Sequence, residues 1–348
     1  MSRISTMVRR SVEQEHHDYC TQDGNAKEKK MPEPIVGLHH VTAIASKPQQ
    51  NLDFYTEVLG LRLVKRTINF DDPGTYHFYF GDDTGTPGTI LTFFPWPHVS
   101  RGSMGVGETS ATAFSVPSES LNYWERRLLR MGLPVEREEL RFEHPVLKFI
   151  DPDGMKLELV GRIGGPEAKP PRTSNVPPEH SISGFFGVTL CEAGFERTAA
   201  VLEKMGFWQA GAEGNRYRFS TASEAHGSHI DVLVQTQLMH GRMGAGTVHH
   251  IAFRAPSDEV QLAWREELKG LGLDITPVLD RRYFHSIYFR EPGGVLFEIA
   301  TDPPGFMTDE PAETLGESLK LPPWYEPKRQ LIETVLPPIA LQPAKSEA

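Results

Sequence analysis

The sequence predicts an α+β fold of four βαβββ modules, arranged as two tandem domains with cup-shaped mixed sheets. From residue 36 onward, short β-rich runs alternate with Gly, Pro and Asp turns, and each group of runs carries one amphipathic helix. The same order recurs four times, which is typical of a chain built by duplication. The second and fourth copies retain visible identity, since MGVGETSATAFSVPS starts at Met104 and MGAGTVHHIAFRAPS at Met243.

Each module is predicted from its own pattern. In the first, the expected strands are GLHHVTAIA, LRLVKRTINF, TYHFYFGD and TILTFF, and the helix is PQQNLDFYTEVLG, which Gly60 ends. In the second, the strands are SATAFSVPS, LPVEREELR, PVLKFIDPDG and MKLELVG, with the helix SLNYWERRLLRMG. In the third, they are FFGVTLCEA, WQAGAEG, NRYRFSTA and HIDVLVQT, with the helix FERTAAVLEKMG. The fourth module runs from HHIAFRAPS to LFEIATD.

Composition shifts along the chain predict its domain boundaries. Residues 1–34 mix charges without hydrophobic periodicity, which indicates a flexible leader. We expect the first domain, with modules one and two, at residues 35–165, and the second, with modules three and four, at 181–302. Residues 166–180 are rich in Pro and polar residues and are the predicted linker. The C-terminal extension, 303–348, contains an amphipathic helix that either covers an edge of the core or closes over a cleft as a lid.

The composition excludes several classes of function. The formal net charge is −10 and no basic block stands out, which argues against a nucleic-acid partner. No apolar run approaches the roughly 20 residues that a membrane helix needs, so we expect no membrane partner. Cysteine is limited to Cys20 and Cys191, which fits a reducing, cytoplasmic location. A homo-oligomer is compatible with the sequence, which leaves the oligomeric state open.

The repeat makes it possible to compare equivalent positions within one chain. One position, on the first strand of each module, holds His40, Ala111, Gly187 and His250 in turn. Another, on the last strand, holds Thr92, Glu158, Val232 and Glu298. Two histidines and one carboxylate on rigid strands would form a facial triad, which leaves open positions on a mononuclear Fe(II). The sequence therefore predicts that His40, His250 and Glu298 bind a metal, and the ligand set also admits Mn(II) or Co(II).

Each candidate ligand has a simpler interpretation. A single strand histidine is more often a hydrogen-bonded core or surface residue than a ligand. Two His-His pairs at matching positions favour the metal, and because strand side chains alternate, His39 and His249 would lie on the other face or behind the ligands. Glu158 is expected to be a solvent-facing or capping carboxylate instead. A structural zinc site is disfavoured because the set contains no cysteine.

Further polar residues lie in DRRYFHSIYFREPGG, residues 280–294. Arg282, His285 and Tyr288 could supply a cation, a proton carrier and a phenol to an anionic aromatic substrate. For His285, a place on the surface is an equally good interpretation. The sequence contains no nucleophile motif or P-loop, and its GxG segments do not join a strand to a helix, which argues against a dinucleotide site.

At this level of detail the chain resembles a known family. GLHHVTAIA, LVKRTINFDDPGTYHFYFGD, GTPGTILTFFPWP, GTVHHIAF and SIYFREPGGVLFEIATD are similar to segments of the vicinal oxygen chelate superfamily, and within it of the dioxygenases that cleave hydroquinone rings. The resemblance spans roughly residues 35–340. It implies that His40, His250 and Glu298 bind Fe(II), with an outer shell of His39, Thr42, His249, Arg282 and Tyr288. It also implies that modules one and four share one cup, with modules two and three as its emptied counterpart.

The resemblance and the triad together predict an enzyme. The expected activity is a non-haem, Fe(II)-dependent extradiol-type dioxygenase that opens a hydroquinone-type ring, plain, substituted or chlorinated, with O₂ as co-substrate. Its partner would be a small aromatic diol, and Mn(II) is the alternative metal. Two other functions stay open: a glyoxalase-like isomerase or thiol transferase, which Thr92 at the fourth ligand position argues against, and a non-catalytic protein that binds small aromatics.

Overall fold

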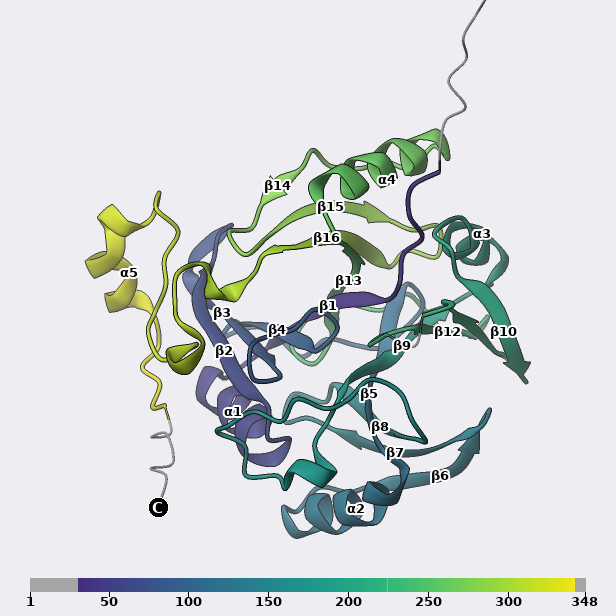
Figure 1. Cartoon of the computed structure of the whole chain (residues 1–348), viewed down its shortest axis with the longest axis horizontal. Coiled ribbons are helices and arrows are strands. Elements are labelled where there is room, and N and C mark those ends of the chain that lie inside the picture. Colours follow the sequence, from purple (N-terminus) through teal and green to yellow (C-terminus); the bar gives the residue numbers. More distant parts are fainter. Residues whose placement is uncertain (1–30, 224, 342–348) are drawn as a thin grey trace, which may run out of the picture. The chain divides into compact units, whose positions relative to one another are not determined.

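A computed structural model describes residues 31–223 and 225–341 (Figure 1). Two eight-stranded mixed sheets make up the fold, in the orders β14-β15-β16-β13-β1-β4-β3-β2 and β10-β11-β12-β9-β5-β8-β7-β6. Each sheet contains two copies of the repeated module, and only short helices accompany them. The predicted α+β class and the fourfold repeat of βαβββ units are therefore confirmed.

The first sheet combines modules one and four. Its strands are β1 (Leu38–Ala45), β2 (Arg62–Asn69), β3 (Asp72–Gly81), β4 (Ile90–Pro95), β13 (Val248–Ala255), β14 (Leu279–Asp280), β15 (Phe284–Arg290) and β16 (Leu296–Pro304). At its centre β1 pairs antiparallel with β13, and each of these strands pairs in parallel with the last strand of its own module, β4 or β16. Modules from opposite ends of the chain thus form one continuous sheet.

The second sheet combines modules two and three in the same way. Its strands are β5 (Glu108–Pro117), β6 (Glu136–Arg141), β7 (His144–Ile150), β8 (Lys156–Arg162), β9 (Gly184–Glu192), β10 (Trp208–Glu213), β11 (Arg216–Ser220) and β12 (His229–Val234). Here β5 and β9 pair antiparallel at the centre. Each sheet therefore takes one module from each half of the chain, and the domain boundaries at residues 165 and 181 stay a prediction.

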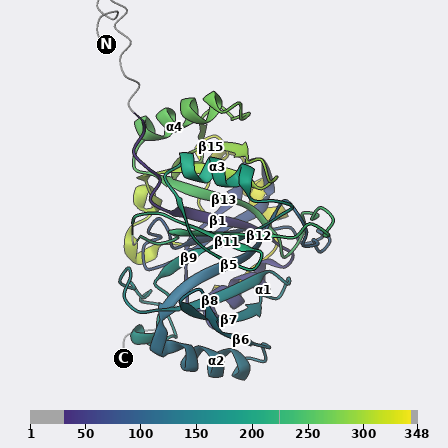
Figure 2. The same ribbon diagram turned by 90° about the vertical axis from the view of Figure 1, so that its right-hand side faces the viewer.

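The helices are α1 (Pro48–Asp53), α2 (Leu121–Arg130), α3 (Glu196–Lys204), α4 (Asp258–Gly270) and α5 (Arg329–Val335). The helix expected in PQQNLDFYTEVLG starts as α1 but continues as a π-helix over Phe54–Val58, before Gly60 adopts a φ of 69°. The Ser257 side chain caps α4 by accepting a hydrogen bond from the Val260 amide. Helix α4 covers β13, β15 and β16, and α2 lies at the opposite end of the view (Figure 2).

Alternation along the central strand separates core from cavity. Val41 and Ala43 on β1 pack into the main hydrophobic core, whereas His40 and Thr42 line a pocket on the other face. All eight residues of β1 are buried. A ligand placed on this strand is therefore held by a rigid, fully packed element.

The C-terminal extension packs beside the first sheet, where α5 contacts β3 (Figure 1). Just before α5, the Tyr325 hydroxyl donates to the Phe70 carbonyl at 3.0 Å, and the ring of Trp324 lies 5.7 Å from that of Phe70. Phe70 lines the pocket described below. The role of the extension as a lid stays a prediction. The expected leader falls largely outside the described residues, among which no helix has the length and apolarity to cross a membrane.

Candidate metal centre

Three buried side chains from adjacent strands meet at one point of the first sheet. The ligand atoms of His40 on β1, His250 on β13 and Glu298 on β16 all lie within 4.8 Å of one another. Glu298 Oε2 is 3.3 Å from His40 Nε2 and 3.0 Å from His250 Nε2, and the two Nε2 atoms are 3.4 Å apart. The pairing of β13 with both β1 and β16 brings the three residues together.

The protonation chemistry of these residues fits a divalent cation. Burial lowers the pKa of His250, so its imidazole is neutral near pH 7. Burial alone would raise the pKa of Glu298, but His40 and His250 together hold it well below its usual range. Glu298 Oε2 is buried without any hydrogen bond, while Oε1 accepts from Ser286 Oγ at 2.5 Å. An ionised carboxylate oxygen without a donor, facing two imidazole nitrogens, is a donor set for a metal such as Fe(II) or Mn(II).

Each ligand histidine is oriented by the histidine that precedes it. His40 Nδ1 lies 2.9 Å from His39 Nδ1, and His250 Nδ1 lies 2.7 Å from His249 Nδ1. Binding a metal through Nε2 leaves the proton of a neutral imidazole on Nδ1, which can then donate to the preceding ring. The two outer histidines differ in exposure to the site: His249 lines the pocket, whereas His39 packs against Phe284 behind His40.

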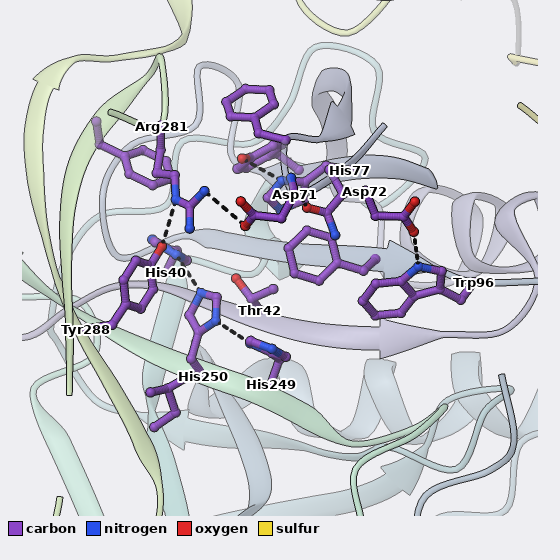
Figure 3. Close-up of a pocket in the computed structure, with 16 residues that line it drawn as sticks. His40, Thr42, Asp71, Asp72, His77, Trp96, His249, His250, Arg281 and Tyr288 are labelled. Atoms are coloured by element: carbon purple, nitrogen blue, oxygen red, sulfur yellow. Dashed lines mark hydrogen bonds and ion pairs between the residues drawn. The ribbon is translucent and has the colours of Figure 1, made fainter. Parts of the chain in front are cut away.

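A cavity of about 410 Å³ opens beside the three ligands (Figure 3). Its apolar wall consists mainly of aromatic rings: Phe70, Phe94, Trp96 and Phe284. Thr42, His77, His249, Arg281 and Tyr288 supply polar groups around it. A mostly apolar hollow with a few convergent polar groups is typical of a site for a small organic molecule, and aromatic walls suit a flat ring.

The cation of this pocket is Arg281, and the expectation for Arg282 was wrong by one residue. Arg281 Nε donates to the Tyr288 hydroxyl at 3.2 Å, and its Nη1 lies 3.2 Å from Asp71 Oδ2 (Figure 3). Arg282 has a φ of 70°, and this left-handed conformation turns its side chain away, with Nε 4.0 Å from Asp309 Oδ2. Tyr288 lines the pocket as expected.

His285 also lies away from the pocket, which favours the surface position over the role near the metal that the sequence equally allowed. Its Nδ1 is 2.7 Å from Asp258 Oδ1, at the start of α4. Strand alternation explains this position, since Phe284 and Tyr288 on β15 line the pocket and His285 points to the opposite face.

Sequence reasoning missed His77 and Tyr79, both on β3. His77 Nδ1 lies 2.8 Å from the Tyr79 hydroxyl, and His77 Nε2 lies 2.8 Å from Thr92 Oγ1. Thr92 Oγ1 in turn donates to Thr42 Oγ1 at 2.9 Å. The repeat contained a signal for Tyr79, because Tyr79 lies opposite Thr92 just as Tyr288 lies opposite Glu298.

Comparison with known proteins settles the family. The model of the Glyoxalase/Bleomycin resistance protein/Dioxygenase superfamily matches residues 37–159 and 174–299. The chain belongs to this superfamily. The resemblance to vicinal oxygen chelate proteins is thereby confirmed, and each of the two matched segments contains two of the repeated modules.

Several superfamily members are similar over nearly their whole length. MhqO of Bacillus subtilis (strain 168), whose name assigns it provisionally to the ring-cleaving dioxygenases, is 49% identical over 313 residues, covering 90% of this chain and 99% of MhqO. The chlorohydroquinone/hydroquinone 1,2-dioxygenase of Sphingobium indicum is 33% identical over 320 residues, covering 90% and 99%. A crystal structure of a B. subtilis protein, provisionally titled a dioxygenase, has a TM-score of 0.85 at 47% identity, covering 89% of this chain and 99% of that one.

The second sheet does not carry the same ligand set at the equivalent positions. Ala111 and Gly187 stand at the histidine positions, as the repeat predicts. Glu158 was expected to be a solvent-facing or capping carboxylate, but it is buried within β8 and accepts hydrogen bonds from Arg141 at 2.7 and 2.9 Å. A bidentate guanidinium therefore stabilises this carboxylate in place of a metal.

The equivalent of Glu298 in module three is Asp231, not Val232 as the sequence comparison suggested. Asp231 pairs with Thr189, two residues after Gly187, just as Glu298 pairs with Ala252, two residues after His250. Asp231 is also buried and accepts hydrogen bonds from Arg216 and Arg218 at 2.8–2.9 Å. Glu158 and Asp231, the two carboxylates of the second sheet at positions equivalent to Glu298, are thus both paired with arginines.

Proposed function

We propose that this chain is a cytoplasmic, non-haem Fe(II)-dependent dioxygenase that opens a hydroquinone-type ring with O₂. The observation that carries the proposal is the buried set of His40, His250 and Glu298 beside an aromatic-walled pocket. The relatives named for ring cleavage, one of them for chlorohydroquinone and hydroquinone, support it. Mn(II) is the alternative metal, since the ligand set accepts it.

His40, His250 and Glu298 would hold the metal. When bound, Fe(II) would supply electrons to O₂ and the Lewis acidity that favours an ionised substrate oxygen. Three protein ligands leave further coordination positions for small molecules, as in other sites with two histidines and one carboxylate. Ser286 fixes the carboxylate, and His39 and His249 fix the imidazoles.

The pocket residues would bind and orient the aromatic diol. Phe94, Trp96 and Phe284 would contact the faces and edges of the ring, and the apolar walls would exclude water. Arg281 and the Tyr288 hydroxyl, which are hydrogen-bonded to each other, would stabilise negative charge on a substrate oxygen.

His249 is the residue we assign to proton transfer. Burial, followed by the neighbouring His250, lowers the pKa of His249 to about 3, so the ring is neutral near pH 7. It lines the pocket, and because its Nδ1 accepts from His250, the proton of the neutral ring lies on Nε2, from which it could be donated to a substrate oxygen. His39 lies behind His40 and would act only on the orientation of that ligand.

The two alternative functions receive less support from the site. A glyoxalase-like isomerase or thiol transferase with a fourth protein ligand would need that ligand at Thr92, whose hydroxyl is already hydrogen-bonded to His77 and Thr42. A protein that only binds aromatics could hold the same metal, but the relatives named for ring cleavage favour an enzyme. Turnover distinguishes both from the dioxygenase.

Oxygen consumption tests the proposal. The protein is loaded with Fe(II) under anaerobic conditions, and O₂ uptake is recorded after addition of hydroquinone or chlorohydroquinone. A separate assay measures conversion of a glutathione hemithioacetal, the substrate of the glyoxalase-like alternative. We expect about one O₂ consumed per ring opened, with loss of the aromatic absorbance. No uptake by metal-replete protein with any hydroquinone would refute the assignment.

A further inference from the structure

Four hydrogen-bonded side chains form one continuous chain in module one, and three of them, Tyr79, His77 and Thr42, line the pocket. The chain runs from Tyr79 through His77 and Thr92 to Thr42, with successive distances of 2.8, 2.8 and 2.9 Å. Tyr79, Thr92 and Thr42 are each at most 1% exposed. Because these groups are almost fully buried, each donor needs an acceptor either within the chain or in the pocket.

This requirement determines which group donates and which accepts in each of the three hydrogen bonds. Among the described residues, the Tyr79 hydroxyl has one hydrogen-bond partner, His77 Nδ1, and Tyr79 is only 1% exposed, so we take the hydroxyl as the donor of this hydrogen bond. Burial lowers the pKa of His77 well below its ordinary value, so the ring is neutral. A neutral ring that accepts at Nδ1 carries its proton on Nε2 and donates to Thr92. Thr92 then donates to Thr42.

The last proton of the chain belongs to Thr42. Its oxygen already accepts from Thr92, and no acceptor for its own proton is found among the described residues. Thr42 lines the pocket and lies opposite His250, a metal ligand, in the pairing of β1 with β13 (Figure 3). The geometry therefore leaves the Thr42 hydroxyl as a donor to whatever occupies the pocket.

The repeat allows the pair Thr92 and His77 in module one to be compared with the pair Glu298 and Ser286 in module four. On β16 the carboxylate of Glu298 faces the metal site and is held by Ser286 on β15. On β4 the equivalent residue is Thr92, and it is held in the same way by His77 on β3. The contact between the two strands thus positions a metal ligand in module four and a hydrogen-bond donor in module one.

We propose that His77 is a positioning residue that acts through Thr92 to direct the Thr42 hydroxyl toward an oxygen of the bound substrate. The inference rests on the proposed function in that the bound oxygen belongs to a hydroxylated ring. The opposite tautomer of His77 would reverse the hydrogen bonds and turn the Thr42 proton back toward Thr92. His77 therefore decides whether Thr42 offers the substrate a proton or a lone pair.

The tautomer can be measured without turnover. Protein labelled with ¹⁵N-histidine and loaded with diamagnetic Zn(II) gives the ring nitrogen shifts by NMR, and the signals missing from His77→Gln assign the residue. We expect a protonated Nε2 and an unprotonated Nδ1, with Tyr79→Phe shifting the balance toward the other tautomer. A proton on His77 Nδ1 in the wild-type protein would overturn the inference.

A double-mutant cycle tests the path through Thr42. The dissociation constant of hydroquinone is measured without O₂ for Zn(II)-loaded wild type, His77→Phe, Thr42→Val and the double variant. We expect each single change to weaken binding by about tenfold, and the second change to add little, because both remove one donor. His77→Gln, which keeps a donor and an acceptor, should retain most of the affinity.

The outcomes separate this inference from the proposed function. Losses that multiply to about a hundredfold in the double variant would show independent, structural effects and overturn the role of His77. Binding of hydroquinone that is indifferent to Thr42→Val would do the same. Absence of O₂ uptake by the Fe(II)-loaded wild type would refute the proposed dioxygenase activity but not the role of His77. The NMR and binding measurements do not depend on turnover.

Discussion

Thr42 on β1 lies directly opposite His250 on β13 at the centre of the first sheet. This register brings His40 to within 3.4 Å of His250, although 210 residues separate them in the chain. The candidate metal centre thus spans the first and last modules, and neither module contains it alone. We therefore expect metal binding to require a correctly paired sheet.

The difference between Arg281 and Arg282 is the sharpest test of the pocket. Arg281→Met removes the cation that contacts Tyr288, and we expect kcat/KM for hydroquinone to fall by about 10- to 100-fold. Arg282→Met is the matched control, since its side chain points away and its backbone conformation is equally strained with Arg or Met. We expect that variant to stay within about twofold of the wild type. Equal losses in steady-state assays of both variants would contradict the assigned orientation.

The second sheet should contribute to stability rather than to chemistry. Glu158→Ala leaves Arg141 with a buried, partly unpaired charge, and we expect the free energy of unfolding in urea to drop by about 3 kcal/mol. Glu136→Ala, at the exposed pair with Lys148, should cost less than about 1 kcal/mol. Both variants should bind as much metal as the wild type. Loss of metal from Glu158→Ala would mean that the second sheet takes part in the metal site.

A pair of buried carboxylates predicts a pH dependence of stability. Glu192 at the end of β9 and Glu291 after β15 each have a carboxyl oxygen 2.6 Å from Thr198 Oγ1, whose single proton can serve only one of them, so a proton on the other carboxyl completes the arrangement. Burial first, and then Glu291, raise the pKa of Glu192 from 4.5 to about 8. Between these values the native state holds a proton that the unfolded chain releases. This contribution to stability is complete below pH 4.5 and is lost as the pH rises through 8.

Glu192→Gln removes this dependence, because the amide imitates the protonated acid at every pH. From pH 5 to 8 the wild type should lose stability relative to the variant, by at most roughly 1.4 kcal/mol per pH unit. Urea unfolding of both proteins across this range measures the effect. Glu196→Gln, at an exposed position of α3, serves as the control. A constant difference between wild type and Glu192→Gln would refute the raised pKa.

Much of this organisation could be predicted from the sequence, because the four repeated modules allow equivalent positions to be compared within one chain. The repeated HisHis pairs and the matching last strands predict which three residues meet, and the structure brings His40, His250 and Glu298 together. The comparison failed where one residue of register matters, as in Val232 for Asp231, because strand register depends on pairing rather than on pattern. Sequence reasoning also failed at Arg282, because no sequence pattern predicts its left-handed φ.

His77 illustrates a second kind of failure. A histidine within TYHFYFGD has no partner in sequence that indicates a role. Its importance arises from the contacts with Thr92 and Tyr79, which depend on how β3 pairs with β4. Ligands at matching repeat positions can be predicted from a sequence, whereas the hydrogen bonds that orient them require the folded sheet.

Metal content tests the account most directly. Wild type, His40→Ala, His250→Ala and His285→Ala are each equilibrated with Fe(II) without O₂, desalted and analysed for iron and protein. We expect about one iron per chain in the wild type and in His285→Ala, whose histidine lies outside the pocket, and at least tenfold weaker binding in both His40→Ala and His250→Ala. Full iron retention by His40→Ala would contradict a metal centre built from the first and last modules.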